Sequence, residues 1–180
     1  MHRILLWPAS LFFFILLGFA TITGQEEVLE VKTFVSQDGV HPGGTVDVAF
    51  LIDIIPGWHI NGPQLADPYL ISCALMIEEN DAVEVKEIFY PVPETETYSF
   101  SEEELQVYEG KAVLGARVRV SESRSPGRLV LKASFLYQAC DNVSCMAPET
   151  LEMEVPLEVV PASRKIRYTH KDIFAQIEFR

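Results

Sequence analysis

The sequence lacks the motifs that mark many common enzyme classes. Its 180 residues contain no Gly-rich phosphate loop, no nucleophile elbow and no zincin motif, so nothing in it supports nucleotide binding or hydrolysis. Basic residues are also scarce, because 14 lysines and arginines stand against 26 acidic residues, a formal net charge of −12. A chain this acidic argues against nucleic acid and anionic membranes as partners.

Long apolar runs are confined to one segment at the start of the chain. Ile4–Ala20 is almost continuously apolar, follows Arg3 and ends in small residues, and Gly24 offers a second cleavage position. These features predict a secretory signal peptide over residues 1–24, with an uncleaved membrane anchor as the alternative. Without Arg3 the mature chain has 13 basic and 26 acidic residues, a charge of −13. We therefore expect an exported protein.

Helical periodicity is almost absent from the rest of the chain. Short segments alternate apolar and polar residues instead, and turns with proline or glycine separate them. About seven or eight such strands predict an all-β, immunoglobulin-like β-sandwich. The clearest predicted strands are Val28–Val35, Val46–Asp53, Tyr69–Ile77, Ala82–Tyr90, Ala112–Val120, Leu129–Tyr137 and Leu151–Val160.

These strands predict one domain, over residues 25–161, followed by a basic C-terminal tail over residues 162–180. The tail is expected to be solvated and to form a short helix over Thr169–Phe179, with the threonine as its N-cap. One long connection interrupts the strands, at Pro91–Gly110. Connections of this length in compact domains are usually functional or disordered.

Cysteine is scarce, with three in the chain. Cys140 and Cys145 lie between two predicted strands of a hairpin, at a spacing that suits a tight turn and brings the sulfurs together. A disulfide that closes so small a loop contributes only roughly 2 kcal/mol in the chain-entropy model. The pair therefore suits a bond that is made and broken in function, and a permanent staple of the hairpin is the alternative. Cys73, in an apolar segment, is expected to be a core residue or else a resolving thiol.

Nothing near the pair in the sequence would lower a thiol pKa, because Asp141 is acidic and the turn holds no lysine or histidine. Such cysteines suit a protein that is attacked by a partner. A third interpretation is copper or zinc binding by the pair with Met146 or with His41, His59 or His170. No histidine has ligand spacing to the pair, so we expect neither a metal nor another cofactor.

Three segments together carry a family resemblance: the cysteine hairpin Tyr137–Thr150, which is the most specific, and two weaker segments, Pro56–Asn61 and Val107–Lys111. In this order they resemble the amino-terminal periplasmic domain of the thiol–disulfide interchange protein DsbD. The resemblance extends over residues 28–160. It implies an immunoglobulin-like domain in the periplasm whose two cysteines, Cys140 and Cys145, shuttle between disulfide and dithiol.

The resemblance also implies partners and a protected site. Domains of this family take electrons from a thioredoxin-like domain and pass them to periplasmic thioredoxin-like oxidoreductases, including those of cytochrome c biogenesis. An aromatic cap loop shields their disulfide. Here Phe100 is the first candidate for the cap residue and Tyr98 is the second. Trp58, His59 and Tyr137 are expected near the site.

In DsbD a membrane domain and a thioredoxin-like domain follow, and this sequence contains neither. We therefore expect a monomeric free-standing carrier, a carrier served by a separate DsbD/CcdA-type membrane electron donor, or a domain that has lost its redox function. An active protein would be a protein-disulfide reductase. The alternative from another class is a non-catalytic immunoglobulin-like binding or scaffold module with a structural disulfide.

Overall fold

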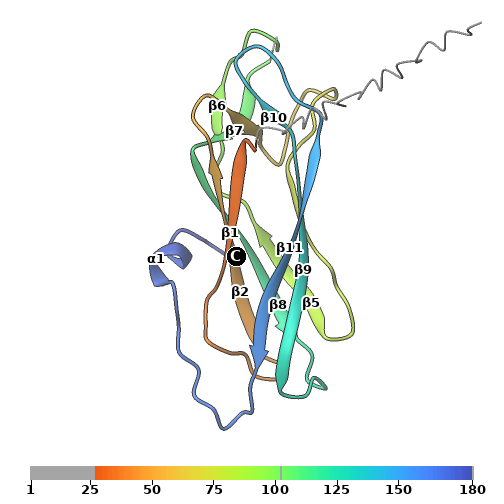
Figure 1. Cartoon of the computed structure of the whole chain (residues 1–180), viewed down its shortest axis with the longest axis vertical. Coiled ribbons are helices and arrows are strands. Elements are labelled where there is room, and N and C mark those ends of the chain that lie inside the picture. The colour runs from red at the N-terminus through yellow and green to blue at the C-terminus, as the bar shows by residue number, and fades with distance from the viewer. Residues whose placement is uncertain (1–26, 102, 180) are drawn as a thin grey trace, which may run out of the picture.

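The computed structural model describes residues 27–101 and 103–179, so the predicted signal peptide lies outside the described residues. Two antiparallel sheets face each other in an elongated immunoglobulin-like β-sandwich, with strand orders β1-β2-β8-β5 and β11-β9-β4 (Figure 1). A third sheet of short strands, β10-β3-β7-β6, closes one end, at the top of Figure 1. The elements are β1 (Leu29–Val35), β2 (Thr45–Ile54), β3 (His59–Asn61), β4 (Ala74–Ile77), β5 (Val83–Phe89), β6 (Glu94–Glu96), β7 (Leu105–Glu109), β8 (Lys111–Val120), β9 (Gly127–Tyr137), β10 (Ala139–Cys140), β11 (Glu149–Val159) and α1 (Lys171–Phe174).

The main core fills the space between the two large sheets. Strand alternation directs every second side chain into it, so that Phe50 of β2, Leu114 of β8 and Phe135 of β9 are at most 1% exposed. Burial of apolar area on this scale is the main driving force of folding. The predicted hairpin that flanks the cysteines is confirmed, because β9 pairs with β11 along its whole length.

Two predictions about the middle of the chain are wrong. The strand expected over Tyr69–Ile77 begins only at Ala74, and Tyr69 is 89% exposed in the preceding loop. The expected long connection Pro91–Gly110 contains β6 and β7, which pair with each other. All three residues of β6 are exposed, so its pairing is made by the backbone and leaves no apolar alternation in the sequence.

The last residues fold back onto the outer face of the sheet β1-β2-β8-β5 (Figure 1). The predicted helix is shortened to one turn, because Thr169 donates its hydroxyl to Val35 O at 2.7 Å instead of capping, and His170 precedes the helix with φ 50°. Ile177 is 9% exposed and packs on this face. A Cβ atom on Gly115 would lie 2.8 Å from its Cγ2, so a larger residue in place of this glycine would push the tail away.

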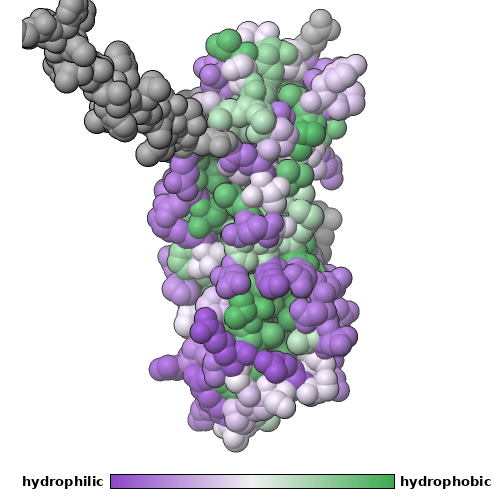
Figure 2. Space-filling view, turned by 45° about the vertical axis from the view of Figure 1, so that its right-hand side comes forward, coloured by the Kyte–Doolittle hydropathy of each residue, from purple (hydrophilic) through white to green (hydrophobic). Residues whose placement is uncertain are grey.

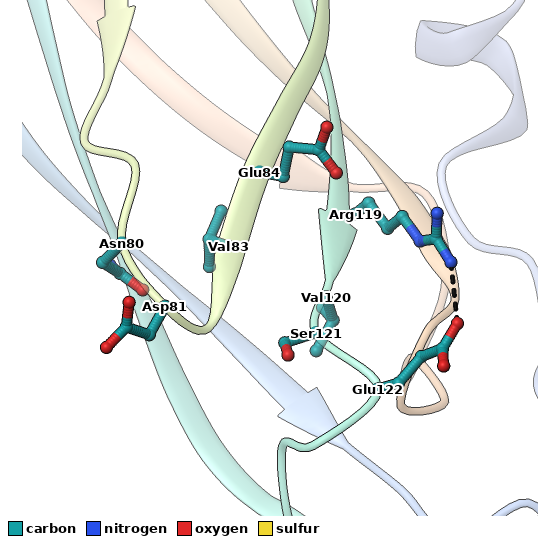
Figure 3. Close-up of a pocket in the computed structure, with 8 residues that line it drawn as sticks. All are labelled: Asn80, Asp81, Val83, Glu84, Arg119, Val120, Ser121 and Glu122. Atoms are coloured by element: carbon teal, nitrogen blue, oxygen red, sulfur yellow. Dashed lines mark hydrogen bonds and ion pairs between the residues drawn. The ribbon is translucent and has the colours of Figure 1, made fainter.

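The remaining surface is largely polar. One face shows apolar patches bordered by hydrophilic side chains (Figure 2). A hollow at the end of the sandwich away from β10 is open and charged, and Arg119 there pairs with Glu122 at 2.9 Å (Figure 3). Within the described ranges, no helix is long and apolar enough to cross a membrane.

Candidate functional site

The two predicted redox cysteines form a disulfide across a tight turn. The backbone closes this turn, since Asp141 N donates to Ser144 O at 2.9 Å and Met146 N donates to Ala139 O at 2.8 Å. The Asp141 carboxylate also accepts hydrogen bonds from the N–H groups of Ser144 and Val143, both at 2.7 Å, and these bonds hold its pKa below the usual range. None of these bonds involves a sulfur, so the turn does not depend on the disulfide alone.

The two sulfur-bearing residues differ in access to solvent. Cys140, in β10, is fully buried, whereas Cys145 is half-buried on the returning side of the turn. An attacking thiolate must approach one sulfur along the S–S bond. Cys145 is therefore the more accessible of the two residues.

Strand β3 brings a histidine to the disulfide from far away in the sequence. Pro56 and Gly57 form a turn before it, with Gly57 at φ 87° and Trp58 N bonded to Ile55 O at 3.2 Å, as a type II turn requires. Because side chains alternate along the strand, Ile60 enters the main core while His59 lies on the opposite face. There His59 stands opposite Cys140 of β10.

An aromatic stack covers this face of the small sheet. The Tyr98 ring lies 4.0 Å from the His59 ring and nearly parallel to it, and the Phe100 ring lies 5.4 Å from that of Tyr98. The Tyr98 hydroxyl donates to Glu109 at 3.1 Å, and the Ser99 hydroxyl donates to Asn142 O in the cysteine turn at 2.9 Å. The loop between β6 and β7 is thus fastened over the site and directly to the turn.

Comparison with known proteins identifies the family. The profile described as thiol:disulfide interchange protein DsbD, N-terminal, matches residues 25–157. The chain belongs to this family. Its members are thiol–disulfide interchange domains, so the Cys140–Cys145 disulfide lies in a fold used for that chemistry.

Among solved structures, one with a TM-score above 0.5 shares the fold of this DsbD-type domain. The N-terminal periplasmic domain of ScsB from Proteus mirabilis is 13% identical with a TM-score of 0.53, over 84% of this chain and 55% of that one. The chain thus spans about half the length of the ScsB domain. The complex between the DsbD and PilB N-terminal domains from Neisseria meningitidis contains a match of 15% identity and TM-score 0.42, over 72% of this chain and 89% of that one. No curated protein matches the chain.

Other predicted residues of this DsbD-type domain lie in different places. Tyr137 belongs to the main core, where its hydroxyl donates to Glu149 at 2.9 Å, and Trp58 packs against the same core. Both side chains therefore contribute to the packing of the main core. Cys73 is outside the disulfide and 2% exposed, and burial raises the pKa of its thiol to about 12. Among the residues that the structure describes, no group of three or more potential ligands could hold a metal ion.

Two buried amides that sequence reasoning did not single out hold the cysteine hairpin in place. The Gln138 carbonyl accepts from Asn61 Nδ2 at 3.2 Å and from Ile71 N at 2.9 Å, and its amide donates to Met146 O at 3.1 Å. This network joins β3, the loop before β4 and the turn. The one available signal was a glutamine two residues before a cysteine, in an otherwise apolar segment.

Replacing Gln138 with alanine should destabilise the DsbD-type domain by about 2 kcal/mol, because Ile71 N–H and the Asn61 amide lose a buried acceptor. Chemical unfolding of the oxidised protein would measure the change in unfolding free energy. Gln106→Ala is the matched control, since Gln106 is exposed on β7. Equal stability of the two variants would show that the network does not hold the hairpin.

Proposed function

We propose that this domain is a periplasmic carrier that relays electrons between thioredoxin-like partners by thiol–disulfide exchange at Cys140 and Cys145. One observation carries the proposal. The disulfide presents one half-buried and one fully buried cysteine on a turn that its own hydrogen bonds maintain. Such a bond can open without loss of the fold, and a partner meets only one of its sulfurs.

The exchange would proceed in two displacements. A thiolate of the reduced partner attacks Cys145 Sγ, the S–S bond breaks, and Cys140 leaves as a thiolate with the electron pair. The partner's second thiolate then attacks the partner's first sulfur, which is bonded to Cys145 in the mixed disulfide, and Cys145 is released. The domain gains two electrons and the partner becomes a disulfide, and the reverse sequence passes the electrons on.

The aromatic stack would make the exchange selective. Tyr98 and Phe100 cover the face on which His59 and Cys140 lie, and the bond from Ser99 to Asn142 fastens this loop to the turn. A docking protein can displace the loop with binding energy spread over its interface, whereas a small thiol has no such energy to use. We assign the shielding role to Phe100 and Tyr98 on this basis.

Family membership supports the class of partner. We propose thioredoxin-like periplasmic oxidoreductases as exchange partners of a monomer, with a DsbD/CcdA-type membrane protein as the electron donor. The activity would be that of a protein-disulfide reductase without a bound cofactor.

A redox titration of the domain without its leader tests the redox function. Thiol/disulfide buffers set the potential, alkylation and mass spectrometry report the state of each cysteine, and circular dichroism reports the fold. We expect the Cys140–Cys145 bond to titrate reversibly while the fold persists, and to exchange faster with a thioredoxin-like protein than with glutathione. A bond that resists reduction until the domain unfolds would instead indicate a structural disulfide in a binding or scaffold module.

A further inference from the structure

Apart from the cysteines, the unusual group at the site is the imidazole of His59. The residue is 1% exposed, and among the described residues its Nε2 has no hydrogen-bond partner. A buried polar atom without a partner is costly, because burial removes the water that would otherwise bond it. Here Cys140 is in the disulfide and has no S–H to donate. The reduced protein would supply that donor.

The imidazole lies in a row of three side chains on one face of the small sheet. The register places Cys140 of β10 on one side of His59 and Glu109 of β7 on the other. Directly opposed residues in antiparallel strands have Cβ atoms about 4.5–5.5 Å apart. The ring of Tyr98 closes the row from above and bonds Glu109. His59 is thus the ionisable side chain placed directly across from the buried cysteine.

The surroundings keep this imidazole neutral and available as a base. Burial lowers the pKa of His59 below its ordinary value, and the carboxylates of Glu109, from β7, and Asp141, from the cysteine turn, oppose that effect. The other groups that face it are Cys140, from β10, and the phenol of Tyr98, from the cap loop. A neutral imidazole has one nitrogen free to accept a proton.

We propose that His59 is the proton acceptor and donor for Cys140 during formation and opening of the disulfide. The inference deepens the proposed redox function and rests on it. It assigns a catalytic role to a residue that the cysteine turn itself does not contain.

In the oxidising direction the reaction begins at Cys145. The Cys145 thiolate, having lost its proton to solvent, attacks an oxidant disulfide, whose departing sulfur takes a proton from solvent. His59 then removes the proton of the Cys140 thiol as that sulfur attacks Cys145 Sγ. The Cys140–Cys145 bond forms, the mixed disulfide breaks, and the departing thiolate receives the electron pair and the proton from His59. The domain's two thiols are oxidised and the oxidant disulfide is reduced to two thiols.

The closing step can be measured alone with oxidised glutathione as the probe. The reduced domain is glutathionylated, and acid quenching with mass spectrometry follows conversion of the mixed disulfide to the Cys140–Cys145 bond. In His59→Phe, which keeps a ring against Tyr98 but has no nitrogen, closure near neutral pH should slow by about tenfold or more. The deficit should shrink as the pH passes the ordinary thiol pKa of about 8.5, because hydroxide then removes the proton.

A second variant separates proton transfer from packing. His59→Gln keeps a polar side chain but cannot take up a proton at these pH values, so it should be as slow as His59→Phe. The control is His41→Phe, since His41 bonds Arg164 O at 2.9 Å in the C-terminal region. Closure at the wild-type rate in a folded His59→Gln domain would overturn the inference, as would a deficit equal at every pH.

The glutathione probe also keeps this inference distinct from the proposed relay. A pH-dependent closing defect together with no exchange with thioredoxin-like proteins would support the role of His59 and contradict the relay. Exchange with such proteins but no closing defect would support the relay and overturn the role of His59.

Discussion

A domain with Cys140→Ser is expected to form a stable mixed disulfide with a thioredoxin-like protein that lacks its resolving cysteine. The serine leaves Cys145 as the free thiol, and Cys145 is half-buried, so the partner can reach it. Cys145→Ser leaves Cys140 as the free thiol of the pair, and Cys140 is fully buried. Both variants keep Cys73, which is buried in the core. Because exchange depends on access to the sulfur, we expect at least about tenfold less complex from this second variant. Non-reducing electrophoresis and mass spectrometry of the linked peptides would measure both yields.

The two serine variants control for each other. Each lacks the disulfide, so loss of the cross-link affects both. The hydroxyl of Cys140→Ser is the more deeply buried one, so any extra destabilisation would fall on the variant that is expected to give more complex. Dithiothreitol should release the partner from either complex. Equal yields, or a higher yield from Cys145→Ser, would contradict the assignment of Cys145 as the attacked residue.

The long strands could be predicted because each has one face toward the core. Val46, Val48 and Phe50 of β2 enter the main core, while Asp47 lies on the outer face and binds Arg117. This two-residue period is visible in the sequence itself. The strands of two to five residues in the end sheet are too short to show a period. Their positions follow from pairing between distant segments, such as β3 with β10, which a single sequence does not display.

The same reason limits what could be predicted of the site. The spacing of the cysteines indicates the disulfide, and the resemblance to DsbD points to Tyr98 and Phe100 and to His59 as a residue near the site. The turn itself holds no histidine, so the local sequence does not show which sulfur His59 would face. The structure brings His59 across from Cys140 through the register of β3 and β10. Its role therefore depends on strand pairing, whereas the cysteine turn is a local feature.

Removing the aromatic stack should expose the disulfide to small thiols. In a Tyr98→Ala, Phe100→Ala double variant we expect reduced glutathione to cleave the Cys140–Cys145 bond about tenfold faster, because access to the disulfide limits exchange. Exchange with a thioredoxin-like protein should change by less than about threefold, since docking displaces the loop in the wild type too. The ratio of the two rates, measured by quenching and alkylation, reports selectivity without depending on protein concentration.

The comparison needs an aromatic residue that is packed but distant from the cysteines. Phe179 fits, because it lies on the outer face of the sheet β1-β2-β8-β5, where the Arg117 guanidinium sits 4.2 Å from its ring centre. Phe179→Ala should leave the glutathione rate unchanged even though it loosens the tail. If the double variant and Phe179→Ala show the same glutathione rate, the stack does not shield the disulfide. Selectivity for protein partners would then have to come from contacts around Cys145 itself.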